Sequence, residues 1–204
     1  MREKLILAAI ERFGKQGFDG VGTREIASAV GTTMSSITYH FGGKEGLYIA
    51  AAEHIFDQLH EQVFASIDSA MPELANHEQQ RDAICLRLCT IGQFMLRDES
   101  APFALFIGRE QQSPSPGVLN LLRGKMLPML EVTVAQVKRL RPDLDDRQAR
   151  AVTLFLFGMA ITLRHSRASL RILLDIDEID PETAAMLLDQ LDQSARRLLT
   201  GGAA

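Results

Sequence analysis

The chain has 204 residues, of which 46% are hydrophobic and 24% charged, and its 22 Lys and Arg residues against 26 Asp and Glu leave a net charge of −4. This balance excludes a disordered, collagen-like or strongly basic protein, and nothing in it points to a nucleic-acid partner. With no Trp, two Tyr, 15 Gly and 7 Pro, the composition favours an all-α fold over a turn-rich β-sandwich or barrel.

The N-terminal part of the chain is predicted to form three short helices separated by glycines. Apolar residues recur at helical spacing from position 5 and stop at Gly14 and Gly17, which predicts a first helix of about four turns. Residues 19–22 form a turn, and Thr23 is the expected N-cap of a second helix, which Gly31 ends in a left-handed conformation. Thr33 is expected to cap a third helix, and a glycine pair breaks it.

The remaining chain is predicted to be helical throughout. A long amphipathic helix runs from Lys44 to about residue 70, where Met71 and Pro72 end it. Five more helices follow, with a kink expected at Pro128 inside the third of them. Their approximate ranges are 79–96, 101–112, 117–140, 145–167 and 181–199.

The sequence gives no sign of a metal, a cofactor or a membrane partner. Cys85 and Cys89 lie four residues apart, a spacing that does not favour a disulfide, and no nearby acid or histidine completes a metal site. We therefore expect two core residues rather than a thiol sensor. No signal sequence is present, and the longest apolar stretch, residues 151–163, is too short to span a bilayer, so we expect a soluble cytoplasmic protein.

Residues 23–41 have the spacing of a helix-turn-helix. Ala27 is small where two helices must cross closely, and Gly31 lies four residues later in the turn. Ile26, Val30 and Ile37 are expected to point inward and fix the angle between the helices. These constraints are geometric and need no basic charge. The alternative for this stretch alone is a helical hairpin without a DNA role.

A wider set of residues around this motif resembles a known family. They are Ala8, Ala9, Phe13, Gly17, Phe18, Thr23, Ile26, Ala27, Gly31, Tyr39, His40, Phe41, Lys44, Glu45 and Leu47. Together they resemble the N-terminal DNA-binding domain of TetR-family transcriptional regulators over about the first quarter of the chain. ITYHFGGKEGLY and FIGREQQSP are similar to segments of the CecR-type subgroup. The resemblance implies a helix-turn-helix DNA-binding domain at residues 1–47 and a helical ligand-sensing and dimerisation domain at residues 48–204.

The resemblance also implies which residues contact double-stranded operator DNA, with residues 34–40 as the recognition helix. The candidates for base-edge contact are Met34, Ser35, Ser36 and Thr38. The candidates for phosphate contact are Thr23, Thr33, Tyr39, His40 and Lys44. Hydroxyls and helix N-terminal amides bind phosphates without much net charge.

This recognition helix departs from the family pattern. Many relatives carry Lys or Arg at the position of Met34 and Gly at that of Ser35, so specificity here leans on hydroxyls, the thymine methyl and DNA shape. Met34 also falls near the apolar stripe of the helix, which favours a packing role. Tyr39 and His40 either contact phosphate, as we expect, or brace the helix.

The segment 150–163 is apolar on several faces and must be covered on several faces. The resemblance implies that the last two long helices of each subunit form a four-helix homodimer bundle, with Gly158 and Ala160 allowing close approach and Phe157 in the interface. The alternative is the central helix of a monomeric bundle.

The resemblance further implies a small-molecule effector in the C-terminal half. The apolar candidates are Phe64, Leu88, Phe103, Phe106, Phe155 and Met159, and the polar ones are Arg109, Glu110 and Thr162. Such a lining suits a largely hydrophobic ligand, although each aromatic also fits a core position. The Arg109–Glu110 pair is either a surface cap or a buried polar anchor.

Three functions compete at this point. The first is a homodimeric repressor that an effector releases from a palindromic operator. The second is a DNA-binding protein of the same fold without a ligand switch. The third is a helical enzyme, which is disfavoured because no nucleophile with a base, carboxylate pair, phosphate loop or metal set is present.

Overall fold

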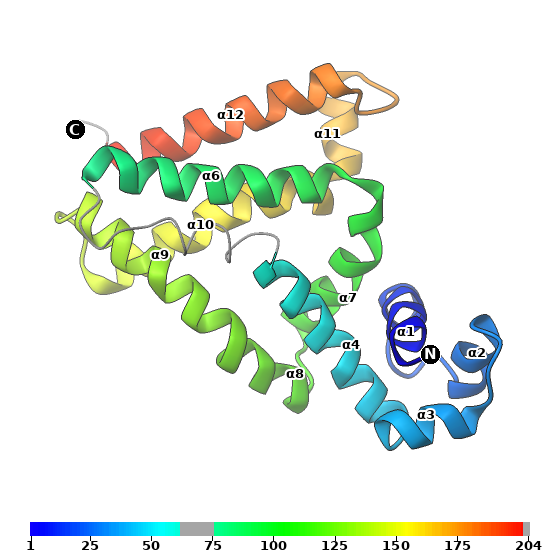
Figure 1. The fold of residues 1–204 in the computed structure, drawn as a ribbon. Helices are drawn as coiled ribbons and strands as arrows, with labels where there is room; N and C mark the ends of the chain where they lie inside the picture. Colours follow the sequence, from blue (N-terminus) through cyan, green and yellow to red (C-terminus); the bar gives the residue numbers. More distant parts are fainter. Residues whose placement is uncertain (62–75, 202–204) are drawn as a thin grey trace. The chain divides into compact units, whose positions relative to one another are not determined.

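The computed structural model describes residues 1–61 and 76–201, and within these ranges the chain forms helices and loops with no strand (Figure 1). This confirms the predicted all-α class. Phe64, one of the predicted ligand residues, lies outside the described residues.

The chain divides into two compact units, and each is built from two separate stretches of sequence. Unit 1 combines Met1–Leu59 with Glu99–Met126, and unit 2 combines His60–Asp98 with Leu127–Ala204. The boundary predicted between residues 47 and 48 falls inside the helix α4 of unit 1. A stretch from the middle of the sequence is therefore packed with the N-terminal helices.

The helix α1 runs past Gly14 and ends before Gly17, whereas α2 and α3 end before Gly31 and Gly42 as predicted. Their bounds are α1 Arg2–Gln16, α2 Thr23–Ala29, α3 Met34–Phe41 and α4 Lys44–Leu59. Gly31 and Gly42 have φ of +68° and +75°, a left-handed conformation that favours glycine. The predicted capping role of Thr23 is wrong, because Gly22 is the N-cap and Thr23 is the first helical residue. Thr33 is the N-cap of α3, but its side chain makes no cap hydrogen bond.

The short helix η2, Asp98–Ser100, lies at the boundary where the second stretch of unit 1 begins. This stretch then forms α7, Ala101–Gln112, and α8, Pro116–Leu121. It ends in a π-helical turn, η3, Leu122–Met126. The predicted helix 117–140 is thus interrupted ahead of Pro128, which has no N–H to donate to the carbonyl four residues earlier.

The core of unit 1 joins α1, α4 and α7. Leu5, Ile10 and Phe13 of α1 are buried against Leu47 and Ile55 of α4. α7 approaches α1 so closely that a Cβ added at Gly14 would lie 2.8 Å from the carbonyl oxygen of Pro102 and 3.3 Å from the amide nitrogen of Phe106. This close approach makes α7 an integral part of the N-terminal unit.

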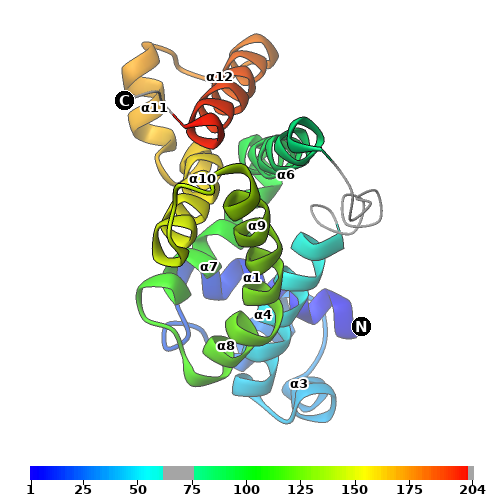
Figure 2. The same cartoon turned by 90° about the vertical axis from the view of Figure 1, so that its left-hand side faces the viewer.

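Unit 2 is a bundle in which α6 lies beside both α10 and α12 (Figures 1 and 2). Its helices are α6 His77–Leu96, α9 Leu127–Leu140, α10 Asp146–His165, α11 Arg167–Leu174 and α12 Pro181–Thr200. Asn76 and Asp145 form capping boxes, and Asp180 caps α12. The helix α11 was not predicted; it begins directly after a break at Ser166, where φ is −105° and ψ is 26°.

The contact between α1 and α7 predicts the effect of Gly14→Ala. Overpacking costs about 1–3 kcal/mol, and the better helix propensity of alanine offsets about 1 kcal/mol, so we expect the free energy of unfolding to fall by about 1 kcal/mol. Chemical denaturation measures this change. Gly124→Ala is the control, since a Cβ there meets nothing within 4 Å. Equal stability of the two variants would contradict the described packing.

Candidate nucleic-acid interface

The helix α3 is attached to unit 1 by the buried Ile37 and the half-buried Phe41, and most of its other side chains are exposed. Ile37 is buried against the core, whereas Met34 is 48% exposed and Tyr39 is 85% exposed. The predicted packing role of Met34 is therefore wrong, and Tyr39 does not brace the helix. The other exposed residues at this helix are Thr33, Ser35, Thr38 and His40.

Short hydroxyl contacts line the start of α3. Thr33 Oγ1 lies 2.7 Å from Ser35 Oγ, and Thr32 Oγ1 lies 2.8 Å from Ser36 Oγ. Ser36 and Thr23 are half-buried. Because hydroxyls donate and accept hydrogen bonds, the Thr33–Ser35 and Thr32–Ser36 pairs can each exchange their mutual hydrogen bond for one to a phosphate or a base edge.

Two cations and the start of α4 surround a hollow of about 700 Å³ beside α3. The ammonium of Lys44 lies 4.4 Å from the ring centroid of Phe18, and the guanidinium of Arg2 lies 5.4 Å from that of Phe41. The further lining residues are His40, Gly42, Gly43, Glu45, Gly46, Ile49, Ala50 and Glu53. Cations beside a helix N-terminus suit an anionic ligand, and a phosphate of a DNA backbone has that chemistry.

Sequence reasoning missed Arg2 as a member of this cluster. The residue lies in α1, 39 positions before its ring partner Phe41. Nothing in the local pattern around Arg2 signals that partner, because the contact depends on how α1 packs with α3 and α4.

The helix pair α2–α3 is held by small and apolar residues. Ile26, Ala27 and Ile37 are buried, and the amide of Thr32 donates to the carbonyl of Ala27 at 2.9 Å. Glu25 of α2 forms an ion pair with Arg12 of α1. The contacts within the pair fix α2 against α3, as the helix-turn-helix spacing predicted, and Val30 is half-buried against the same core.

Four aromatic rings meet where α1, α4 and α7 join. The ring centroid of Tyr48 lies 4.9 Å from that of Phe13, 5.1 Å from Phe18 and 4.7 Å from Phe106. The Tyr48 hydroxyl donates to Glu110 Oε1 at 2.5 Å. Burial is the main cause of the raised pKa of the Tyr48 phenol, and the Glu110 carboxylate raises this pKa further. The hydroxyl therefore remains protonated, and a hydrogen-bond donor, at neutral pH. We call these four rings with Glu110 the aromatic junction.

The predicted ligand residues are divided between the two units. Phe103, Phe106, Arg109 and Glu110 belong to unit 1, whereas Leu88, Phe155, Met159 and Thr162 belong to unit 2. Leu88 and Phe106 are buried in packed cores, Phe103 and Met159 are half-buried, and Phe155 and Thr162 are exposed. Both alternatives for the charged pair apply: Arg109 caps the end of α1 at the surface, and Glu110 is a buried anchor.

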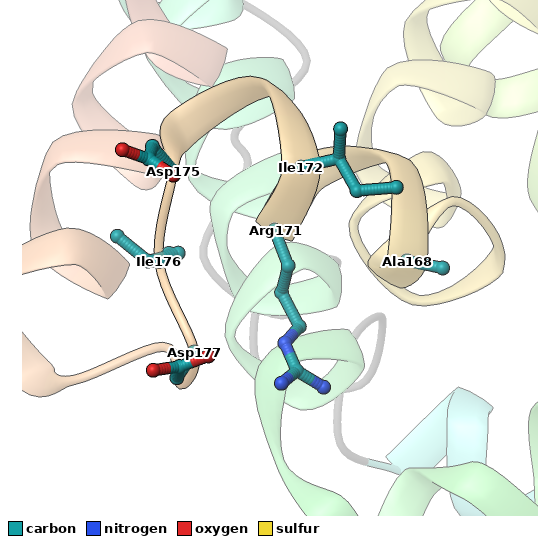
Figure 3. A pocket seen from close by; sticks show the side chains of 6 residues that line it. All are labelled: Ala168, Arg171, Ile172, Asp175, Ile176 and Asp177. Carbon is teal, nitrogen blue, oxygen red and sulfur yellow. The ribbon is translucent and has the colours of Figure 1, made fainter.

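A hollow of about 510 Å³ lies between α11 and the loop that follows it (Figure 3). It is lined by Ala168, Arg171, Ile172, Asp175, Ile176 and Asp177. None of the predicted ligand residues within the described ranges lines this hollow or the one beside α3.

The burial of Phe157 in α10 differs from the predicted place of this residue. Phe157 is only 7% exposed and is packed in the core of unit 2, so its predicted place in a dimer interface is wrong. Phe155 is instead 64% exposed, with Leu154 and Ile161 also exposed. A Cβ added at Gly158 meets nothing within 4 Å. Leu154, Phe155, Gly158 and Ile161 are called the α10 stripe below.

No cluster of three potential metal ligands occurs among residues 1–61 and 76–201. In the same ranges no helix is long and apolar enough to cross a membrane. Cys85 is buried and Cys89 is half-buried, and both thiols are free. Burial raises the pKa of both thiols, to about 12 for Cys85.

Comparison with known families identifies the class of protein. Residues 5–51 match the family of bacterial regulatory proteins called tetR, and residues 78–202 match the C-terminal domain of the HTH-type transcriptional dual regulator CecR. The chain belongs to the TetR family of DNA-binding transcriptional regulators, and its C-terminal domain is of the CecR type. This confirms both resemblances, and it makes the chain a regulator rather than an enzyme.

Particular relatives support this assignment. CecR of Shigella flexneri is 37% identical over 118 residues, which cover 56% of this chain and 52% of CecR. RaaS of Mycobacterium tuberculosis is 42% identical over 65 residues, 32% of this chain and 30% of RaaS. The chain thus matches about half or less of the length of these curated relatives.

Two solved structures share the fold across nearly the whole chain. AibR, in complex with isovaleryl coenzyme A and operator DNA, superposes with a TM-score of 0.72 at 13% identity, covering 95% of this chain and 96% of AibR. The ketosteroid regulator KstR2 of Mycobacterium tuberculosis gives 0.68 at 17% identity, covering 96% of this chain and 92% of KstR2.

The raised thiol pKa values predict a pH dependence of stability. Folding keeps Cys85 protonated up to about pH 12, whereas a thiol in the unfolded chain ionises near its ordinary pKa of 9.0. Between these values the unfolded state binds fewer protons, so the free energy of unfolding falls as pH rises from about 9 to 12. Denaturant titrations of the wild-type chain and Cys85→Ala measure the slope. A slope that is equal in both chains would contradict the role of this thiol.

Proposed function

We propose that the chain is a homodimeric repressor that binds a palindromic operator in the cytoplasm and leaves it when a small, largely hydrophobic effector binds. In this proposal residues 1–47 read DNA, and residues 48–204 sense the effector and dimerise. The observation that carries the DNA-reading part is the exposure of α3, whose single buried residue is Ile37. A helix in this setting has its whole outer face available to the major groove.

The proposed contacts follow the exposure of the side chains. Ser35 and Thr38 are exposed and Ser36 is half-buried, which suits hydroxyl contacts to base edges, and Met34 suits the thymine methyl. Thr23, Thr33, Tyr39, His40 and Lys44 are the proposed phosphate contacts. With few cations, the interface depends more on hydrogen bonds and DNA shape than on charge.

The repressor role is supported by the names of relatives. NicS of Pseudomonas putida, 33% identical over 78 residues, is called a transcriptional repressor, and IcaR of Staphylococcus aureus, 36% identical over 59 residues, a negative regulator. CecR is called a dual regulator. A dimer bound at a promoter represses transcription because it excludes other proteins from that DNA.

The α10 stripe supports the dimer. Leu154 and Phe155 project from α10, and Gly158 leaves room for another helix to approach closely. Large exposed apolar side chains gathered on one helix face indicate an interaction surface. Two DNA-reading units on one palindrome multiply their affinities, which compensates for a small positive charge. The proposed interface is therefore α10 with α12, the last two long helices.

The proposed effector is supported by a structural neighbour. The same fold holds isovaleryl coenzyme A in AibR, and Leu88, Met159 and Thr162 of unit 2 remain the proposed contacts, together with Phe64. One observation favours the second candidate, a DNA-binding regulator without a ligand switch: Leu88 and Phe106 are buried in packed cores. The two candidate functions differ in one respect: only the ligand-released repressor has an effector, which binds the free protein and the operator-bound protein with unequal affinity.

The proposed DNA contact of Tyr39 is tested by the variant Tyr39→Ala. Because the side chain is 85% exposed, its removal leaves the melting temperature unchanged, but the loss of a phosphate contact weakens operator binding by about tenfold. Gel-shift titration against a duplex that the wild-type chain selects from a random library measures this, and Lys44→Ala is expected to act alike. Leu7→Ala, which removes an exposed apolar side chain from α1, is the control. Wild-type affinity of Tyr39→Ala would refute the site.

The proposed dimer interface is tested by the variant Phe155→Glu. A buried carboxylate without a partner opposes association, so this variant is a monomer at concentrations where the wild-type chain is a dimer. Sedimentation velocity measures the mass. Leu105→Glu, at an exposed apolar residue of α7, is expected to remain dimeric. A dimeric Phe155→Glu would exclude the α10 stripe as the interface.

A further inference from the structure

Arg109 of α7 holds the C-terminal end of α1. Its Nε donates to the carbonyl oxygen of Gly14 at 3.0 Å, and its Nη2 donates to that of Lys15 at 2.9 Å. Carbonyls in the last turn of a helix have no partner within the helix, and a cation there also opposes the negative end of the helix dipole. Gly17, whose φ of +78° favours glycine, ends α1 beside this guanidinium.

Glu110, the next residue of α7, connects α4 to α8. Its Oε1 accepts from the Tyr48 hydroxyl, and its Oε2 accepts from the amide of Ser115 at 2.8 Å and from the Ser115 hydroxyl at 3.2 Å. The side chain is 5% exposed, and these three bonds satisfy both carboxylate oxygens. Adjacent residues of α7 therefore bond to the two helices that flank α2 and α3 in the sequence.

Those two helices set the orientation of α3. α2 is tied to α1 by the ion pair of Glu25 with Arg12, and α4 begins three residues after α3 ends, with the two helices in contact. A change in the angle between α1 and α4 consequently tilts α3. The bonds of Arg109 and Glu110 oppose such a change.

We infer that Arg109 and Glu110 are positioning residues for operator binding, which hold α1 and α4 at the angle that presents α3 to DNA. The inference rests on the proposed function, since it assumes that α3 reads the operator. It assigns to residues 109–110 a role in the DNA-reading unit, although they lie far beyond α4 in the sequence.

The test separates positioning from stability. In the full-length chain, Arg109→Ala removes the bonds to α1, and Tyr48→Phe removes the donor to Glu110 while keeping the buried ring. Each variant is titrated with a duplex that the wild-type chain selects from a random library, and each is used to select its own duplexes. We expect roughly tenfold weaker binding to the wild-type duplex, an altered spacing between the selected half-sites, and recovery of most of the affinity in Arg109→Lys.

Arg167→Ala is the matched control. Arg167 Nη1 donates to the carbonyl oxygen of Leu96, the last residue of α6, at 3.0 Å, so the same kind of bond is lost from unit 2. We expect a lower melting temperature with unchanged affinity and half-site spacing. Folded Arg109→Ala and Tyr48→Phe that bind and select as the wild-type chain does would overturn the inference. A wild-type chain that selects no duplex would overturn the proposed function, and the inference with it.

Discussion

The aromatic junction around Tyr48 is the contact on which the rest of unit 1 depends. Phe13, Phe18, Tyr48 and Phe106 come from α1, the turn after it, α4 and α7, and their rings fill the point where these elements meet. The Tyr48 hydroxyl needs a buried acceptor, and Glu110 supplies it. The apolar cluster fixes the distances between these helices, whereas the hydrogen bond fixes their relative orientation. Together they define the direction in which α4 runs from the end of α3.

A firmly held scaffold explains how a short helix with little charge can serve as a DNA-reading element. The helix α3 has eight residues, of which five are exposed, so one whole face of it is available to a ligand. In the proposed interface, its hydroxyls and Tyr39 would recognise DNA only if the backbone that carries them is fixed in advance, because hydrogen bonds are strongly directional. The net charge of −4 was therefore a poor guide to this family, and residue spacing was the informative property.

Local signals explain which features of the fold were predictable. Gly31 and Gly42 end helices because a left-handed residue is needed there, and the pattern of Ile26, Ala27 and Ile37 specifies a helix pair. The sequence shows Arg109 and Glu110 as a charged pair, but their partners in α1 and α4 lie 94 to 95 and 62 positions away, and no periodicity encodes such contacts. In α10, the sequence does not distinguish the exposed Phe155 from the buried Phe157, because a helix that is apolar on several faces does not reveal which face its own unit covers.

Amide hydrogen exchange of the full-length chain, with and without a duplex that it selects, tests the central claim most directly. The account predicts that DNA slows exchange in residues 33–45, which include α3 and the start of α4, and that the last turn of α1 beneath Arg109 is slowed with them. DNA-dependent protection confined to unit 2, with residues 33–45 unchanged, would contradict it.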